Sequence, residues 1–272
     1  MKIRKRQLGL MFLVAVAAIF SLGGTAASAT WTSPTGEWDF TVTGAKKGSA
    51  YLSFNSDQTI AGYILVVPSP GNKGGKDHVS TFGFAFLTGQ WQFDSRGQIV
   101  GFLNNDPSTE VRLDTTSFTG KVKKNGVGFT ITGVTEDGKL TFTGVPFQTL
   151  TPLPTVWTIQ KKAKKRLIFT EIFDAQPDTT VPDHNLYDLF GEGANLCIYG
   201  HGVLSKSNNF NVSFVEYPKP DSSDCSDINP ATATGVGSAG VGKINLNTGK
   251  ATLTGAQEGS PSLPVSMPVF CQ

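Results

Sequence analysis

The sequence predicts an all-β protein, an antiparallel meander of hairpins that forms a barrel or a barrel-like sandwich. Several segments alternate apolar and polar side chains, as at Trp38, Phe40 and Val42, and this period places one face of a strand against a core and the other in water. Short turn sequences separate the segments. Asn125-Gly126 is the clearest of them, because both residues accept the positive φ of a type I′ hairpin turn.

The N-terminal residues 1–29 are typical of a bacterial secretory signal peptide. Four basic residues lie within the first six positions, the apolar run Leu8–Leu22 follows, and Ala27–Ala29 supplies the small residues of a cleavage site. The apolar run is about 15 residues long, shorter than the 20 or so that a membrane-spanning helix needs. We therefore expect a mature chain of residues 30–272, exported to the periplasm or the outside of the cell.

The net charge of the mature chain argues against nucleic acid as a partner. Four of the 23 Lys and Arg residues fall in the signal peptide, whereas none of the 21 Asp and Glu residues does, which leaves 19 basic against 21 acidic residues. A nearly neutral chain lacks the basic footprint of a general nucleic-acid binder.

Glycines recur at one position of the predicted hairpins, two residues after an apolar side chain. The offset of two puts each glycine on the same face of the strand as that side chain. A glycine in a strand commonly marks a bulge or a bend. The return strands are therefore expected to curve into a closed or nearly closed structure. The glycines concerned are Gly62, Gly101, Gly120, Gly144 and Gly255.

A curved sheet would enclose an apolar interior. Its ligand-facing side chains are predicted to be Trp38, Phe40, Trp91 and Phe93. A small apolar ligand could then bind inside the barrel.

The mature region forms either one domain or two β units. The Pro-rich stretch 146–154 and the basic run after it interrupt the hairpins, so a boundary is expected near residues 146–166. The best helical pattern spans Asp183–Phe190, where Leu186, Leu189 and Phe190 have helical spacing, and it predicts a turn or two of helix.

Two GxW triplets, Gly36-Glu37-Trp38 and Gly89-Gln90-Trp91, resemble the opening of calycin barrels such as lipocalins and avidins. In those families such a Trp packs across one end of a ligand-holding barrel. The resemblance covers three residues at each place and implies a barrel architecture.

Three cysteines lie in the mature chain, where an oxidising compartment permits a disulfide. We expect Cys225 to pair with Cys271, because both lie in loop-like or terminal sequence; three unpaired thiols are the alternative. Cys197 shares a predicted strand face with His201, and this pair is a weak candidate for a copper or zinc site.

The one strong charge cluster of the mature chain is the run Lys161, Lys162, Lys164, Lys165 and Arg166. It favours a solvated turn between two strands, charged to prevent edge pairing. Contact with a membrane surface or an acidic polysaccharide through these five residues is the alternative.

No catalytic motif stands out, and no cofactor is indicated. The sequence therefore favours a noncatalytic exported protein of the bacterial cell envelope, which binds a small apolar ligand or an envelope glycan or has a structural role at the surface. The alternatives are a secreted carbohydrate-active enzyme and an outer-membrane β-barrel.

Overall fold

A computed structural model describes residues 32–69, 83–105, 116–123, 128–135, 138–163, 166–178, 185–193, 195–219, 224–229, 233–257 and 265–272. The signal peptide predicted for residues 1–29 and the turn at Asn125-Gly126 lie outside these ranges. Within the ranges, no helix is long and apolar enough to span a membrane.

The first half of the chain forms a closed antiparallel barrel in which each strand pairs with the next and the eighth pairs with the first. Closure joins Trp38 of the first strand to Pro146 of the eighth. The strands are β1 (Gly36–Gly44), β2 (Lys46–Phe54), β3 (Thr59–Pro68), β4 (Gly83–Phe93), β5 (Gln98–Asn105), β6 (Thr116–Val122), β7 (Phe129–Thr135) and β8 (Gly138–Pro146).

The second half forms another closed antiparallel barrel with the same meander, in which the last strand pairs with the ninth. Its strands are β9 (Val156–Ala163), β10 (Arg166–Pro177), β11 (Leu186–Glu192), β12 (Leu196–Ser205), β13 (Asn209–Pro218), β14 (Val236–Asn245), β15 (Lys250–Gln257) and β16 (Val265–Cys271). Two short 3-10 turns, η1 (Lys206–Asn208) and η2 (Cys225–Asp227), accompany them.

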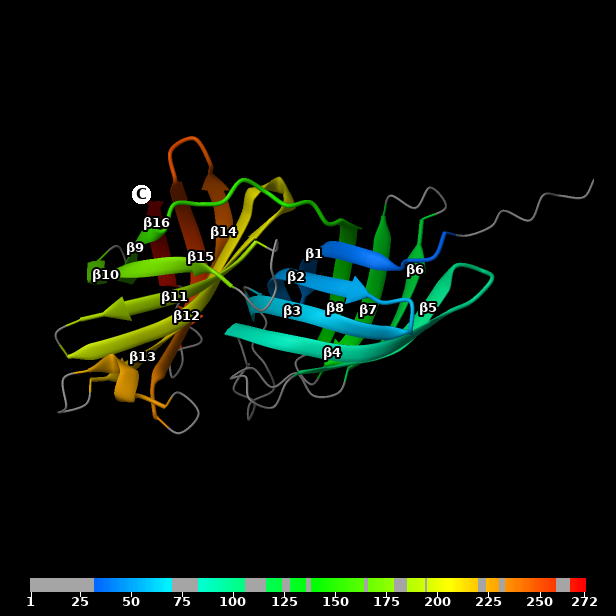
Figure 1. Cartoon of the computed structure of the whole chain (residues 1–272), viewed down its shortest axis with the longest axis horizontal. Helices are drawn as coiled ribbons and strands as arrows, with labels where there is room; N and C mark the ends of the chain where they lie inside the picture. Colours follow the sequence, from blue (N-terminus) through cyan, green and yellow to red (C-terminus); the bar gives the residue numbers. More distant parts are fainter. Residues whose placement is uncertain are drawn as a thin grey trace, which may run out of the picture.

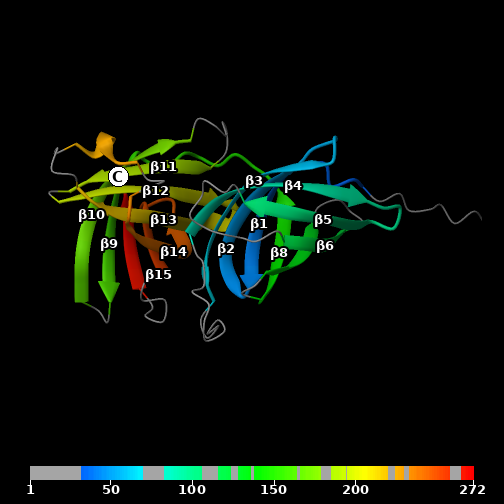
Figure 2. The same cartoon turned by 90° about the horizontal axis from the view of Figure 1, so that it is seen from below.

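The two barrels lie side by side along the long axis of the molecule (Figures 1 and 2), and the chain passes between them from Pro146 to Val156. The predicted all-β antiparallel fold is confirmed, and of the two forms left open the barrel is the one observed.

The helical turn predicted over residues 183–190 is wrong where the structure describes this segment, because Leu186–Glu192 is strand β11. Tyr187 and Leu189 face the core of the second barrel, while Leu186 is buried on the opposite face against the first barrel. A strand with apolar residues on both faces produced the helical spacing.

Aromatic side chains fill the interior of the first barrel. Phe129 contacts the rings of Trp38, Phe40 and Phe54 at centroid separations of 5.0 to 5.5 Å, a range in which aromatic pairs attract one another. These rings need glycines beside them. A Cβ at Gly144 would lie 2.5 Å from Cε1 of Phe40, so a larger residue there would displace the ring.

Both barrels begin with the same local structure. The indole N–H of Trp38 donates to the carbonyl oxygen of Pro34, and that of Trp157 donates to the carbonyl oxygen of Pro154, each at 2.7 Å. The bond satisfies the polar atom of a ring buried in an apolar core. The two barrels are therefore alike in their first strand as well as in topology.

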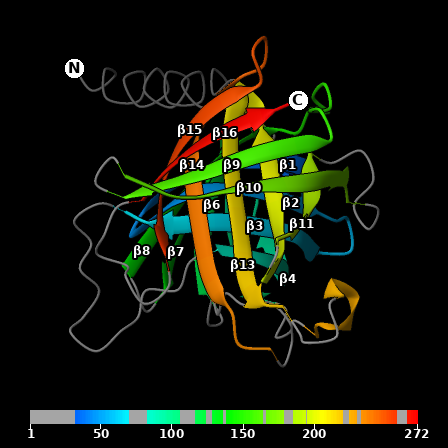
Figure 3. The same cartoon turned by 90° about the vertical axis from the view of Figure 1, so that its left-hand side faces the viewer.

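The barrels touch through the outer faces of β2–β4 and β11–β15. An apolar cluster of Tyr51, Tyr63, Leu65, Phe84, Leu186 and Val203 joins them. Two buried hydrogen bonds lie beside it: the Ser49 and Ser205 hydroxyls share one (3.3 Å), and the Ser49 hydroxyl and the Asn211 side-chain amide form the other (2.7 Å). In Figure 3 the strands of the second barrel cross in front of those of the first.

Candidate functional site

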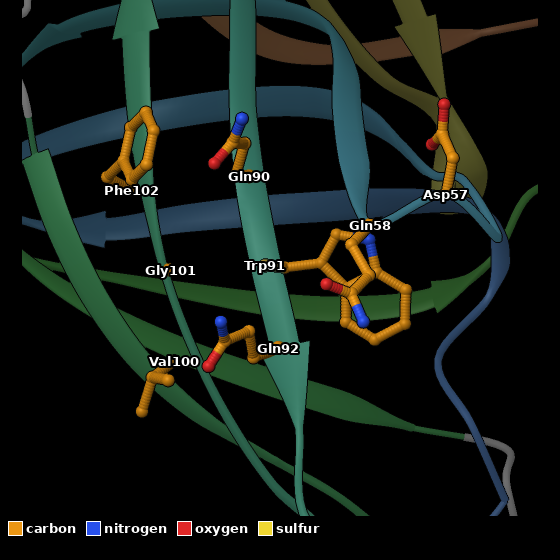
Figure 4. A pocket seen from close by; sticks show the side chains of 8 residues that line it. All are labelled: Asp57, Gln58, Gln90, Trp91, Gln92, Val100, Gly101 and Phe102. Atoms are coloured by element: carbon orange, nitrogen blue, oxygen red, sulfur yellow. The ribbon is translucent and has the colours of Figure 1, made fainter.

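A pocket of about 250 Å³ lies on the first barrel, where the β2–β3 turn approaches strands β4 and β5. Figure 4 shows residues 90–92 following one another along β4 and residues 100–102 along the neighbouring β5, with the two turn residues beside them. The lining residues are Asp57, Gln58, Gln90, Trp91, Gln92, Val100, Gly101 and Phe102.

The turn that supplies two of these residues has a strained backbone. In Asn55–Gln58 the amide N–H of Gln58 donates to the carbonyl of Asn55, and in Asp94–Gly97 the N–H of Gly97 donates to the carbonyl of Asp94. The fourth residue has a positive φ in both turns, 69° at Gln58 and 76° at Gly97. Glycine accepts this conformation freely, whereas a residue with a side chain is destabilised by about 1 kcal/mol or more.

Gln58 occupies the position at which the parallel turn has glycine. Strained residues of this kind cluster at binding sites. Its backbone also fixes the pocket floor, because the N–H of Trp91 donates to the Gln58 carbonyl (2.9 Å) and the Trp91 indole donates to the Asn55 carbonyl (3.2 Å).

The wall of the pocket alternates amide and apolar side chains. Gln90 and Gln92 lie on the outer face of β4, and their register partners on β5 are Phe102 and Val100. Each amide both donates and accepts hydrogen bonds. Phe102 and the half-exposed Val100 add apolar surface between them. Hydroxyl groups and C–H surface together would match this wall.

Asp57 places a negative charge at the rim. Its carboxylate accepts hydrogen bonds from the backbone N–H of Thr59 (3.0 Å) and from the Thr59 hydroxyl (2.6 Å). These two bonds lower the pKa of Asp57 below its ordinary value, since both stabilise the ionised form. The carboxylate is exposed and charged at neutral pH.

The four residues predicted to face an interior ligand lie on the inner face of the first barrel. Trp38, Phe40 and Trp91 are buried in its core, and Phe93 packs against it. They contact other aromatic rings, as Trp91 contacts Phe54 at 5.6 Å. An apolar ligand would have to displace those rings; a ligand-facing role for the four residues stays a prediction.

The predicted disulfide is corrected. Cys225 is bonded to Cys197, and Cys271 is a free, buried thiol. The reason lies in the position of Cys197 on the outer face of β12, where the segment that contains η2 folds over it. The Tyr199 hydroxyl donates to the carbonyl of Cys225 and holds the same segment. Cys271 instead faces the core of the second barrel.

The disulfide also overturns the candidate metal pair Cys197 and His201, because the sulfur of Cys197 is not a thiolate. Among the described residues there is no group of three or more metal-binding side chains. His201 is placed between the barrels instead, where its ring stacks on Phe84 with centroids 3.9 Å apart.

Asp188, His201 and Ser213 stand in register on β11, β12 and β13. They are the residue types of a hydrolase triad, and Nδ1 of His201 lies 3.2 Å from Oδ1 of Asp188. Ser213 is buried, and the His201 ring is stacked on an aromatic ring. We therefore assign these three residues to the contact between the barrels.

The basic run is only partly a solvated turn. Lys161 points into the second barrel, where its ammonium group is buried, donates to the Ser238 hydroxyl (3.1 Å) and lies 3.7 Å from Oε1 of Glu216. Membrane contact through Lys161 is therefore wrong. Lys162 is half-buried on the other face of β9; Lys164 and Lys165 and the side chain of Arg166 lie outside the described part.

Sequence reasoning missed the pocket residues Asp57, Gln58, Gln90 and Gln92. One signal was available, since the turns Asn55–Gln58 and Asp94–Gly97 follow the same plan and only one of them has glycine at its last position. The amides of β4 carry no comparable signal, because polar residues are ordinary on the wet face of a strand.

Comparison with models of known protein families gives no match, and comparison with curated proteins gives none either. Among solved structures, the chain is similar to transferrin binding protein B from Haemophilus parasuis Hp5, a vaccine antigen. A double mutant of that protein aligns at 8% identity over 87% of this chain and 74% of that one, and a single mutant at 10% identity over 87% and 75%; both have a TM-score of 0.24. The similarity concerns β architecture alone.

Proposed function

We propose that residues 30–272 form an exported, noncatalytic protein of the bacterial cell envelope that binds a glycan in the pocket on the first barrel. The observation that carries this proposal is the lining of the pocket, in which three glutamine amides, one of them on the strained Gln58, meet one carboxylate and an apolar strip. Amides and carboxylates form hydrogen bonds with sugar hydroxyls, and apolar side chains pack against the C–H faces of the ring.

Two features of the pocket support binding over catalysis. Glycoside hydrolysis ordinarily needs a pair of carboxyl groups on either side of the scissile bond. Asp57 is the one carboxylate among the described lining residues, and its lowered pKa suits it poorly to donate a proton to a leaving group. A glycan incubated with the protein is expected to stay intact.

The packed aromatic core of the first barrel supports an outer rather than an inner site. Its rings contact one another at 5.0 to 5.6 Å, so a ligand inside would require repacking, which costs stability in a well-filled core. The outer pocket needs no such change.

The experiment is a glycan array probed with the purified mature chain and with the double variant Gln90→Ala, Gln92→Ala. Loss of two hydrogen-bonding side chains should weaken binding by about tenfold, from about 0.5–1.5 kcal/mol per bond. Thr88→Ala is the matched control, because Thr88 is exposed on the outer face of β4 outside the pocket lining. An array without signal, or equal signal from the double variant, would overturn the proposal.

A further inference from the structure

We infer that the pocket selects uncharged glycans over anionic ones, and that Asp57 is the residue that determines this selectivity. The inference rests on the proposed function and names the substrate class of the same site. It follows from the charges that line the pocket and from the two hydrogen bonds that hold the Asp57 carboxylate in position.

The first argument is that the described lining residues include no cation to receive an acidic sugar. The described lining residues comprise three glutamines, an aspartate, a glycine and three apolar or aromatic side chains. Proteins bind carboxylates and phosphates with Arg and Lys, whose N–H groups form charge-assisted hydrogen bonds. A lining without either type offers an anion only neutral donors.

The second argument is the fixed position of the negative charge. Thr59 donates two hydrogen bonds to the Asp57 carboxylate, at 3.0 Å from its backbone N–H and at 2.6 Å from its hydroxyl. A carboxylate held in this way keeps its charge and its position near the ligand. A uronic acid bound beside this carboxylate would be repelled by its like charge.

The third argument is the arrangement of Gln90 and Gln92, which face outward two residues apart on β4 with Phe102 and Val100 opposite. Their amides accept and donate equally, as the hydroxyls of a neutral sugar do. A ligand that carries a carboxylate where a neutral sugar has a hydroxyl would accept hydrogen bonds from the amide N–H groups. The amide oxygens would then face an acceptor and would have no donor. Unpaired polar groups of this kind lower affinity.

The test uses hexamers of β-1,4-linked glucose, galactose and N-acetylglucosamine, each beside the same hexamer with its primary hydroxyls oxidised to carboxylates. Binding to the mature chain is measured by calorimetry at about 0.15 M and 0.5 M salt. For a hexamer that binds, the oxidised form should bind at least about fivefold more weakly, because the Asp57 carboxylate repels the added carboxylates. At high salt the two affinities should differ less, because salt screens the repulsion between the carboxylates.

Asp57→Asn should reduce the ratio of the two affinities to about twofold or less, because the repelling charge is removed while Asn can still accept from Thr59 and keep the turn. Asp224→Asn is the control. Asp224 is an exposed carboxylate of the second barrel, which likewise accepts a backbone N–H, from Ser226 at 2.9 Å, so its removal changes net charge equally and should leave the ratio unchanged.

Equal or tighter binding of the oxidised hexamers, or an unchanged ratio in Asp57→Asn, would overturn the inference and leave the proposed function standing. If none of the hexamers binds, the inference fails, and the array decides whether the proposed function fails with it.

Discussion

At the scale of single residues, inner-face glycines show where the sequence pattern had a physical cause. Gly101 pairs with Trp91 on one side and Phe118 on the other. A Cβ at Gly101 would lie 2.6 Å from Cζ of Phe118 and would also meet the carbonyl oxygen of Gln90. The offset of two residues from Ile99 showed that Gly101 lies on the inner face. The reason that glycine is needed there is the close approach of the Phe118 ring and of the backbone of β4.

Gly101→Val is therefore expected to destabilise the protein by about 1–3 kcal/mol through overpacking. The measurement is the urea midpoint of unfolding. Thr130→Val on β7 is the control, because Thr130 lies on the outer face, where valine suits a strand. A glycine variant as stable as the control would contradict the prediction.

Asp39 is a residue whose environment no sequence pattern showed. It lies on the outer face of β1, yet only 5% of it is exposed, and Oδ2 has no hydrogen-bond partner among the described residues. Burial raises its pKa from 3.8 to about 7, partly offset by the backbone N–H and the charge of Lys206. The charge of Asp39 in turn helps to raise the pKa of Tyr63.

This shift predicts a pH dependence of stability. Between about pH 4 and pH 7 the folded protein holds a proton on Asp39 that the unfolded chain releases, so the contribution of Asp39 to stability falls as pH rises through this window. Asp39→Asn should raise the free energy of unfolding by up to about 4 kcal/mol at pH 8 and change it little at pH 4. Urea unfolding at both pH values measures the difference in stability between the variant and the parent chain. The same difference at pH 4 and at pH 8 would refute the prediction.

At the scale of strands, the alternation of apolar and polar residues predicted correctly which face points inward where the other face is exposed to water. It failed where both faces of the strand are buried. β11 was taken for a helical turn because Leu186 meets the first barrel while Leu189 meets the core. β9 was taken to end in a solvated basic turn, but its alternation continues through Ile159 to Lys161, which faces inward. The pattern assigns every lysine to the solvent-exposed face, so it cannot identify a lysine that points into the barrel.

The inward charges of the second barrel form a small network. Lys161 lies near Glu216, and burial raises the pKa of Glu216 and of Glu171, the latter also raised by the Glu216 charge. Burial lowers the pKa of Lys161, and the Glu216 charge opposes that change. Buried ion pairs of this kind add little to the net stability of a protein. Removing one partner is nevertheless strongly destabilising, because the other charge stays buried without its partner.

Lys161→Ala should therefore destabilise by about 3 kcal/mol, whereas Lys161→Met with Glu216→Leu should come within about 1 kcal/mol of the parent. Thermal or urea unfolding gives both values. Lys162→Ala, on the opposite face of β9, is the control. A double variant as unstable as the single one would show that the cost comes from lost packing.

The Cys197–Cys225 disulfide links two segments separated by 28 residues. Cys225→Ser should lower stability by about 2–4 kcal/mol, because the bond restricts the unfolded chain. Cys271→Ser is the comparison, a buried thiol without a bond. Urea unfolding with and without a reductant separates the two: the reductant should lower the midpoint of the parent chain and leave Cys225→Ser unchanged.

At the scale of the whole molecule, hairpin turns and alternating strands identified the fold class because they are local properties. The pairing of β1 with β8 and of β9 with β16 is not local, and no pattern specified it. The contact between the barrels was hidden for the same reason, since Ser49 and Asn211 are polar residues on outer faces and are buried only by the other barrel. The candidate pocket depends on the approach of the β2–β3 turn to β4 and β5, which no pattern within a single strand shows.

Ring closure has a consequence for the kinetics of folding. Each barrel has two free edges until its eighth strand arrives, because Trp38 must find Pro146 and Trp157 must find Cys271. Contacts so distant along the chain form slowly, and an open edge offers unpaired N–H and C=O groups to other molecules. Since the first ring is complete before β9 begins, it can close while the second is still being made. The second ring stays open until β16 has been made, so a variant chain that lacks β16 should form an open sheet that aggregates in place of a closed ring.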